Sequence, residues 1–351
     1  MPAFLHAIGT AVPPHDVHPA FLGWARQQLA GRDATVFDRM AARAGIGHRW
    51  SVLPVERSPV VAGEFYDAAS WPGTAARMAI YAQEAPGLAC SAIDKLAEQV
   101  PIEGITHLVL ASCTGFVAPG IDQIIARRMG LAPSVERLLI GFMGCYAAVA
   151  ALRSARHIVR SDPSARVLVV TVELSTLHLQ QTSDLEPMLA MLQFGDGAAA
   201  ALVTAEPGGL ALGQPFATTL PDSHDLIRWA ITDEGFAMHL SGEVPGRIAA
   251  MLADKAFAKG AIGGCHPSDI DGWAVHAGGR SILDAVERAL ALPADALDAS
   301  RTVLADNGNM SSATLMFVLK KLLAGPPVTQ GVALAFGPGL AAEGFTFESS
   351  A

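Results

Sequence analysis

Short apolar runs alternate along this chain with longer stretches in which apolar residues recur at helical spacing. The runs have the length of buried strands, and the longer stretches have the length of helices that cover a sheet. The runs that predict strands are 4–8, 107–112, 138–142, 167–173, 198–204, 273–276, 331–336 and 345–348. The stretches that predict helices are 71–96 with an interruption at Pro86, 120–129, 145–160, 244–258, 280–291 and 311–323.

Alternation of this kind is typical of a layered α/β protein with parallel or mixed sheets. Pro207, Gly208 and Gly209 follow a strand-like run, and the segment after them up to about Asp233 is the least regular in the chain. We therefore expect a boundary near residue 206, with one half over 1–205 and another over 206–351. Faint similarities between the halves, ITHLVLASCTG with DIDGWAVHAGG and VLVVTVEL with GVALAFGPG, indicate an internal duplication.

Composition narrows the class of protein. Hydrophobic residues make up 51% of the chain and charged residues 16%, enough to bury a large core. The formal charge is 24 − 33 = −9 and no long Lys/Arg run occurs, which argues against a nucleic-acid partner. No apolar run approaches the ~18 residues of a membrane span, so we expect a cytoplasmic protein without a membrane partner.

Four cysteines lie at positions 90, 113, 145 and 265, too far apart for a C-x-x-C pair or a zinc-finger spacing. We expect reduced thiols, no metal and no redox cofactor. Cys145 has the most distinctive surroundings: in IGFMGCYAAVAALRSA it opens an Ala-rich helix after a Gly-x-x-Gly turn. The positive end of a helix stabilises a thiolate, so this position suits a nucleophile for acyl transfer, although a buried structural cysteine would also fit.

Two further strand-to-helix corners carry polar side chains of matching chemistry. His276 ends an apolar strand and precedes Gly278 and Gly279, where its imidazole could pair with a thiolate. Asn309 lies in DNGNMSSATLMFVL, where its amide could donate to an oxyanion, although Asn307 is an equally good helix cap. Cys, His and Asn at three such corners are more specific together than any one of them alone.

The strings GFMGCYAA, VHAGGRSILDAVE, GNMSSAT and AFGPGLAAEGF resemble the type III polyketide synthases, the chalcone-synthase-like family, over nearly the whole chain. The resemblance implies a duplicated αβαβα thiolase-like layered sandwich with mixed sheets, and a homodimer. It makes Cys145 the acyl-carrying nucleophile, with His276 and Asn309 as its partners.

The same resemblance assigns substrate-binding residues. Phe194 matches a gatekeeper aromatic, and the other residues expected to contact substrate are Cys113, Trp229, Met238 and Ser311. The residues expected to contact CoA are Arg43, His48, Arg49, Gly279 and Ser281. Cys113, Ala118, Met238 and Ala277 each replace a different residue of the plant enzymes, and together they favour an aliphatic starter, whereas Trp229 adds bulk near the cyclisation pocket.

The reaction implied is iterative. An acyl-CoA starter acylates Cys145, a malonyl-CoA or methylmalonyl-CoA extender loses CO2, and the resulting enolate attacks the bound thioester. Ring closure would give a pyrone, a resorcinol or a phloroglucinol-type product. The CoA thioesters are substrates, so no cofactor is implied.

Two alternatives remain open from the residues. A ketoacyl-ACP synthase III-like enzyme would carry out one condensation and would need a basic docking patch for its acidic carrier. A non-catalytic acyl-binding subunit would need no activated thiol. Formation of triketide and tetraketide products separates the preferred hypothesis from both alternatives.

Overall fold

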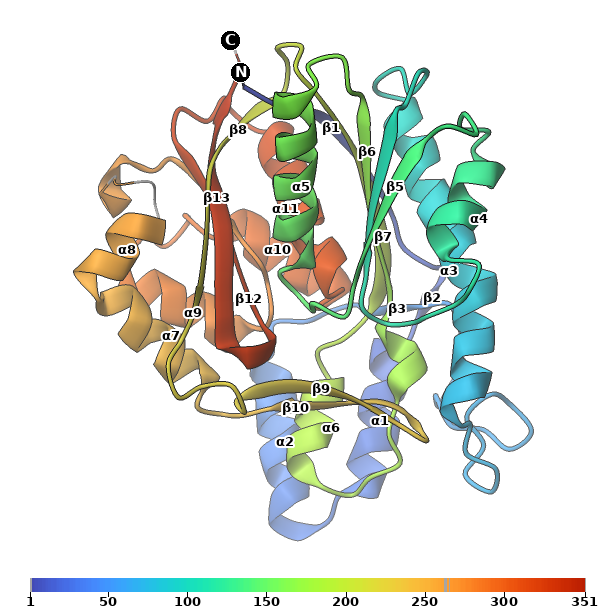
Figure 1. Ribbon diagram of the computed structural model, residues 1–351. Helices are drawn as coiled ribbons and strands as arrows, with labels where there is room; N and C mark the ends of the chain where they lie inside the picture. The colour runs from blue at the N-terminus through green and yellow to red at the C-terminus, as the bar shows by residue number, and fades with distance from the viewer. Residues whose placement is uncertain (1, 262–263, 265, 351) are drawn as a thin grey trace.

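A computed structural model describes residues 2–261, 264 and 266–350. Within that part of the chain the centre is a mixed nine-stranded sheet with the order β11-β12-β13-β8-β1-β7-β6-β4-β5 (Figure 1). The pairs β4–β5, β4–β6 and β11–β12 are parallel, and the other neighbours are antiparallel. The strands are β1 (Phe4–Ala11), β4 (His107–Ser112), β5 (Glu136–Gly141), β6 (Val167–Leu174), β7 (Asp196–Thr204), β8 (Leu210–Thr219), β11 (Gly272–Val275), β12 (Gly331–Gly337) and β13 (Ala341–Ser349).

Helices and two small sheets surround the large sheet. The α-helices are α1 (His18–Gln28), α2 (Gly31–Arg43), α3 (Thr74–Ala97), α4 (Ile121–Arg128), α5 (Ala147–Ser161), α6 (Leu185–Met191), α7 (Val244–Ala253), α8 (Lys255–Ala261), α9 (Arg280–Ala289), α10 (Asp298–Asn307) and α11 (Ser312–Leu323). The 3-10 helices are η1 (Ser175–His178), η2 (Pro267–Asp269) and η3 (Pro338–Leu340). The small sheets pair β2 (His15–Asp16) with β3 (Trp50–Ser51), and β9 (Ile227–Thr232) with β10 (Gly235–Leu240).

Alternation along the strands sorts the core into layers. In β4, Val109 and Ala111 pack with α5 and α11, whereas Leu108 and Leu110 pack with α3 and α4. In β12, the side chains at 333 and 335 face α5 and α11, and those at 332 and 334 face α7 and α9. The helices α5 and α11 therefore lie between two parts of the sheet, with other helices outside (Figure 1). This α-β-α-β-α order confirms the predicted α/β layered sandwich with mixed sheets.

The predicted strands are present with end shifts of a few residues. Two helix predictions need correction. Pro86 does not interrupt its helix, because α3 continues through it while packing on β1 and β7. The predicted helix over 244–258 is divided at Asp254, whose extended backbone separates α7 from α8.

The expected boundary near 206 falls between β7 and β8. Both strands pair with β1, since Phe4 lies opposite Thr204 on one side and Ala211 on the other. Division into 1–205 and 206–351 stays a prediction. No helix in the described part of the chain is long and apolar enough to cross a membrane.

Candidate active site

Cys145 lies in the turn between β5 and α5, two residues before the helix begins. The turn needs left-handed backbone at Phe142 (φ 57°) and Gly144 (φ 82°). A Cβ at Gly144 would lie 2.4 Å from Cδ of Pro338, so glycine is also required for the close approach of η3. The cysteine is 8% exposed.

The environment of Cys145 differs from the low-pKa thiol that its helix-end position predicts. Burial raises the pKa of the thiol to about 12, and the charge of Glu173 acts in the same direction. Hydrogen bonding to the side chains of Ser311 and Asn309 lowers the pKa but does not offset burial. The thiol is neutral in this state of the site, and a base must remove its proton before it can attack.

The side chain of Asn309 lies beside this thiol, and two hydrogen bonds to neighbouring backbone groups fix its position. Its Nδ2 donates to the carbonyl of Gly278 (3.3 Å), and its Oδ1 accepts from the backbone N–H of Ser311 (2.8 Å). Ser311 directly precedes α11 and adopts a left-handed φ of 48°, a strained conformation for a residue with a side chain. This turn places the side chains of Asn309 and Ser311 against the sulfur.

His276 directly follows β11 and is 1% exposed. Its backbone N–H donates to Leu334 (2.8 Å), and its carbonyl accepts from Gly278, whose own carbonyl holds the Asn309 amide. Neither Nδ1 nor Nε2 of the ring has a hydrogen-bond partner among the described residues, and burial lowers the pKa of the imidazole to about 3. The ring is therefore neutral, and the pairing with a Cys145 thiolate expected from the sequence is not formed as a hydrogen bond here.

Glu173 is a buried acid beneath the same corner, and the sequence reasoning missed it. Its carboxylate accepts from the backbone N–H of Cys113 (2.9 Å) and from the hydroxyls of Thr114 (2.8 Å) and Ser312. Burial raises its pKa to about 7. The available signal was a single acid near the end of the otherwise apolar run VLVVTVEL.

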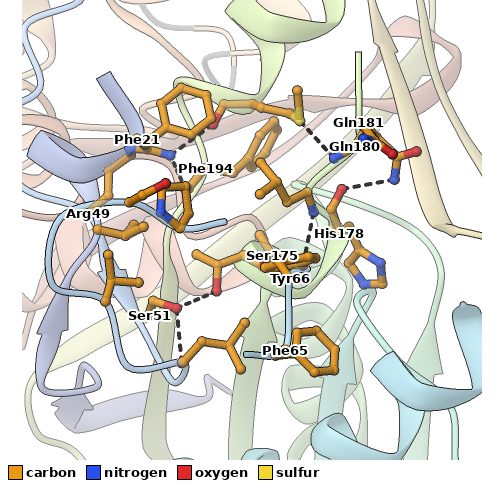
Figure 2. A pocket seen from close by; sticks show the side chains of 18 of the residues that line it. Phe21, Arg49, Ser51, Phe65, Tyr66, Ser175, His178, Gln180, Gln181 and Phe194 are labelled. Carbon is orange, nitrogen blue, oxygen red and sulfur yellow. Dashed lines mark hydrogen bonds between the residues drawn. The ribbon is translucent and has the colours of Figure 1, made fainter. Parts of the chain in front are cut away.

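A cavity of about 620 Å³ opens beside these corners (Figure 2). Its walls come from the 53–66 loop, α1, η1, α6 and the β9–β10 hairpin. Phe194, Trp229 and Met238 line it as predicted substrate contacts, whereas Cys145, His276 and Asn309 do not. Phe194 lies where the cavity meets the turn that carries Asn309, because it lines the cavity and forms a β-bridge with Asn309. We call this place the junction.

The predicted cavity residues Cys113 and Ser311 lie on the cysteine side of this junction. Cys113 Sγ accepts from the backbone N–H of Gly144 (2.9 Å), and its carbonyl accepts from Trp229 Nε1 (3.2 Å). Cys113 therefore supports the nucleophile turn and holds the β9–β10 hairpin. His178, which is buried, lines the cavity, and its ring is stacked 4.2 Å from that of Phe236.

The predicted CoA contacts fall into two groups. Arg43, His48 and Ser281 are exposed, and the Arg280 guanidinium donates to the Arg43 carbonyl (3.4 Å), which brings the end of α2 next to the start of α9. Gly279 is buried at the start of α9. Arg43, Gly279 and Ser281 therefore lie where α2 meets α9, a place that we call the α2–α9 rim.

Arg49 is not exposed with these residues, and the CoA contact expected for it from the sequence stays a prediction. It is 2% exposed and lines the cavity, and its Nε and Nη1 are bonded to groups inside the protein, whereas Nη2 has no partner among the described residues. Its position next to His48 in AGIGHRW gave no sign of this, because the chain turns inward at β3.

Among the described residues, no group of three or more His, Cys, Asp or Glu side chains could hold a metal ion. Cys265 lies outside the described residues, and Cys90, Cys113 and Cys145 are free thiols.

Comparison with known proteins gives consistent matches over the whole chain. Residues 1–207 match the family described as chalcone and stilbene synthases, N-terminal domain, and residues 212–351 match the corresponding C-terminal domain. A curated relative from Mycobacterium tuberculosis, named alpha-pyrone synthesis polyketide synthase-like Pks18, is 35% identical over 285 residues, which cover 78% of this chain and 72% of the relative.

Solved structures agree with the sequence matches. The crystal structure of PKS-I from the brown alga Ectocarpus siliculosus has a TM-score of 0.90 and 28% identity, covering 99% of this chain and 98% of that one. The type III polyketide synthase domain of Steely1 from Dictyostelium has a TM-score of 0.88 at 24% identity, covering 100% of both chains, and shows likeness of fold.

Proposed function

The chain belongs to the chalcone and stilbene synthase family and is a type III polyketide synthase, so we propose that Cys145, His276 and Asn309 carry out its decarboxylative condensations. The observation that carries this proposal is the convergence of the three corners: the Asn309 amide lies against the Cys145 thiol and is bonded to the turn that follows His276. The enzyme is an acyltransferase that acts on CoA thioesters.

Acyl transfer begins with a proton. We propose that the His276 ring, whose two nitrogens have no partner, takes the thiol proton of Cys145 as sulfur attacks the starter thioester. The carbon–sulfur bond to CoA then breaks, and CoA leaves with the electron pair. Thiolate and imidazolium form together, so their attraction in a dry site offsets the burial that keeps each group neutral alone.

Condensation needs a place for negative charge. Loss of CO2 from a malonyl thioester leaves an enolate, and its oxygen requires hydrogen-bond donors. The Asn309 amide and a protonated nitrogen of His276 supply them, and the enolate carbon then attacks the thioester on Cys145. The carbon–sulfur bond to Cys145 breaks, the thiolate leaves with the electron pair, and the lengthened chain is carried on CoA until it is transferred back to Cys145. Each cycle lengthens the chain by one unit and regenerates the free thiol after transfer. Methylmalonyl-CoA is a second candidate extender.

The cavity beyond Phe194 supports an aliphatic starter. Its walls include Phe21, Leu53, Phe65 and Leu179, and its volume lies in the range of pockets that bury small organic ligands. We propose that Phe194 separates this space from the condensation site as a gatekeeper. The product is a pyrone, a resorcinol or a phloroglucinol-type ring.

CoA phosphates need positive charge outside the cavity. The exposed Arg43 supplies it, His48 and Ser281 expose polar side chains, and Gly279 brings backbone close to the pantetheine arm. His48 also contacts Asp16, because its Nδ1 lies 2.7 Å from the Asp16 carboxylate.

The outer edge of the sheet supports a homodimer. The edge strand β5 exposes Leu138 and Leu139, and Phe116 lies exposed near the same edge. An unpaired edge with large apolar side chains is a surface that proteins normally cover. We propose that a second copy of this chain covers it.

The test is product formation. Wild-type protein is incubated with a panel of aliphatic and aromatic acyl-CoA starters and malonyl-CoA, and products are identified by mass spectrometry. Triketide and tetraketide products from the aliphatic starters support the proposal. A single condensation, or dependence on acyl-carrier substrates, would favour the ketoacyl-ACP synthase III-like alternative.

A further inference from the structure

Arg49 makes a set of interactions that a CoA contact would not need. Its Nε donates to His18 Nδ1 (2.9 Å), and its Nη1 donates to the carbonyls of Met191 (2.8 Å) and Phe194 (2.9 Å). The guanidinium carbon lies 4.4 Å from the centre of the Phe21 ring, and Figure 2 shows the arginine beside Phe21 and Phe194. One side chain thus bridges α1 and the turn after α6.

The turn that Arg49 holds is the one that carries Phe194 and pairs with Asn309. The Gln193 carbonyl accepts from the Asn309 N–H (2.7 Å), and the Asn309 carbonyl accepts from the Gly195 N–H (3.1 Å). A displacement of the 191–195 backbone would therefore move both the proposed gate and the proposed oxyanion donor.

The stem of Arg49 adds a second constraint on the same corner. A Cβ at Gly308 would lie 2.8 Å from Arg49 Cγ and 2.8 Å from the Gln193 carbonyl, and Gly308 has a left-handed φ of 67°. The arginine stem and the turn therefore pack directly against the backbone that precedes Asn309. Arg49 contacts the two sides of the Phe194–Asn309 bridge.

The charge of Arg49 is retained inside the protein without an ion pair. None of the ion pairs between described residues includes it, although Asp16 and Asp196 are near enough to act on its charge. Burial lowers its pKa to about 9, so it remains protonated at neutral pH. His18 accepts its hydrogen bond as a neutral ring, because burial lowers the pKa of that imidazole to about 4.

We infer that Arg49 is a positioning residue for the condensation site, which fixes the 191–195 turn so that Phe194 and Asn309 keep their places. The inference rests on the proposed function, since it assumes that Asn309 and Phe194 act in that reaction. A planar fork with several donors in fixed directions suits this task, whereas a lysine ammonium cannot reach the same three acceptors in the same geometry.

The experiment compares Arg49→Lys and Arg49→Met with wild type. Steady-state kinetics with an accepted acyl-CoA and malonyl-CoA are measured at a temperature where thermal unfolding shows each variant folded. We expect kcat to fall about 100-fold in Arg49→Met and about 10-fold in Arg49→Lys, the scale of loss from a misplaced reacting group, with KM changed less than about 3-fold. The ratio of triketide to tetraketide should also change, which a uniform loss of folded protein would not cause.

Arg26→Met is the matched control, because Arg26 is an exposed arginine of α1 paired with Asp38. It should leave kcat, KM and product ratio unchanged. Arg43→Met provides the contrast, and it should raise KM with little change in kcat.

Three results would overturn the inference. They are a rise in KM with unchanged kcat for both Arg49 variants, wild-type kinetics and products for Arg49→Lys, or equal loss of all products in folded Arg49→Lys. If Arg49→Met does not fold, Arg49→Lys alone decides. Absence of polyketides from wild-type protein in the same assay would instead contradict the proposed function.

Discussion

At Cys145 and His276, burial changes the pKa of both side chains in the direction that keeps each neutral. The two shifts, to about 12 and about 3, leave a neutral thiol and a neutral imidazole whose ring nitrogens have no partner among the described residues. A single proton transfer between them creates two opposite charges at once, which is less costly in a dry site than either charge alone. We propose that the site carries out a coupled proton transfer during attack.

The donors at the condensation site give the first prediction. Substitution His276→Ala or Asn309→Ala removes one of the two proposed donors to the enolate oxygen, so malonyl-CoA decarboxylation should fall by about 100-fold or more. Release of CO2 without starter measures it directly.

Asn307→Ala is the control for that experiment. Its side chain bonds the Val303 carbonyl and the Trp50 indole and takes no part in the site. A similar fall in this variant, or full activity in Asn309→Ala, would contradict the assignment.

Glu173 gives a prediction about stability and pH. Burial raises the pKa of Glu173 from its ordinary value of 4.5 to about 7. Between these two pH values the folded protein keeps the proton on Glu173, whereas the unfolded chain has released it. Folded protein binds more protons in that window, so the free energy of unfolding falls as pH rises through it. Glu173→Gln cannot release a proton, and its stability relative to wild type should increase by up to about 3 kcal/mol between about pH 5 and pH 8.

Urea unfolding of both proteins at the two pH values measures this difference. Because other titrating groups, such as Asp196, are common to both proteins, their contributions cancel. A difference that is constant with pH, or that decreases as pH rises, would contradict a raised pKa at Glu173.

At the scale of elements, the site is made where two central helices begin. The turn before α5 carries Cys145, and the turn before α11 carries Asn309 and Ser311. Both turns require left-handed backbone, at Phe142 and Gly144 in one and at Gly308 and Ser311 in the other. Because these turns join rigid elements, small changes in them displace the reacting groups.

Gly144 tests this dependence. Alanine there would be strained at φ 82° and would collide with Pro338, so Gly144→Ala should destabilise the protein by more than about 2 kcal/mol and abolish chain extension. Gly130→Ala isolates the strain, because Gly130 also has a positive φ (65°) but nothing lies within 4 Å of its Cβ position.

The control variant Gly130→Ala should lower the free energy of unfolding by about 1 kcal/mol and keep its activity. Urea unfolding and product formation are compared for the two variants. Equal costs at the two glycines would show that the contact with η3 contributes nothing.

The sequence predicted these turns better than it predicted the cavity. Strands that end in glycine-rich turns before helices are visible as patterns, and they placed Cys145 and His276 correctly at such turns. The strand expected before Asn309 is wrong, because Asn309 lies in the turn between the helices α10 and α11. The cavity walls come from η1, α6, the β9–β10 hairpin and the 53–66 loop, which are short or half exposed and show little periodicity. Glu173 was missed and the bonds of Arg49 to the 191–195 turn were not predicted, because both depend on contacts with residues more than 100 positions away.

At the scale of the whole molecule, the apolar core lies between the layers of sheet and helices, and the edge of the large sheet at β5 is not covered by another element of the described chain. The strand β5 ends the sheet with Leu138 and Leu139 exposed, although the residues around it in β4 are buried. A homodimer formed through this edge would remove these side chains from water.

Leu139→Asp tests the proposed dimer. A charge at the centre of a buried interface should shift the protein from dimer to monomer at micromolar concentration, as measured by light scattering after size-exclusion chromatography. Leu22→Asp, on the partly buried face of α1 away from β5, should stay dimeric if it folds. A monomeric wild type, or an unchanged dimer in Leu139→Asp, would contradict an interface at this edge.

The most direct test of the account is the site of acylation. Wild-type protein is incubated with an aliphatic acyl-CoA in the absence of malonyl-CoA, digested, and analysed by peptide mass spectrometry. The account predicts an acyl adduct on the peptide that carries Cys145, absent from the peptides of Cys90 and Cys113 and lost when malonyl-CoA is added. An adduct on another residue, or no adduct on a preparation that makes polyketides, would contradict it.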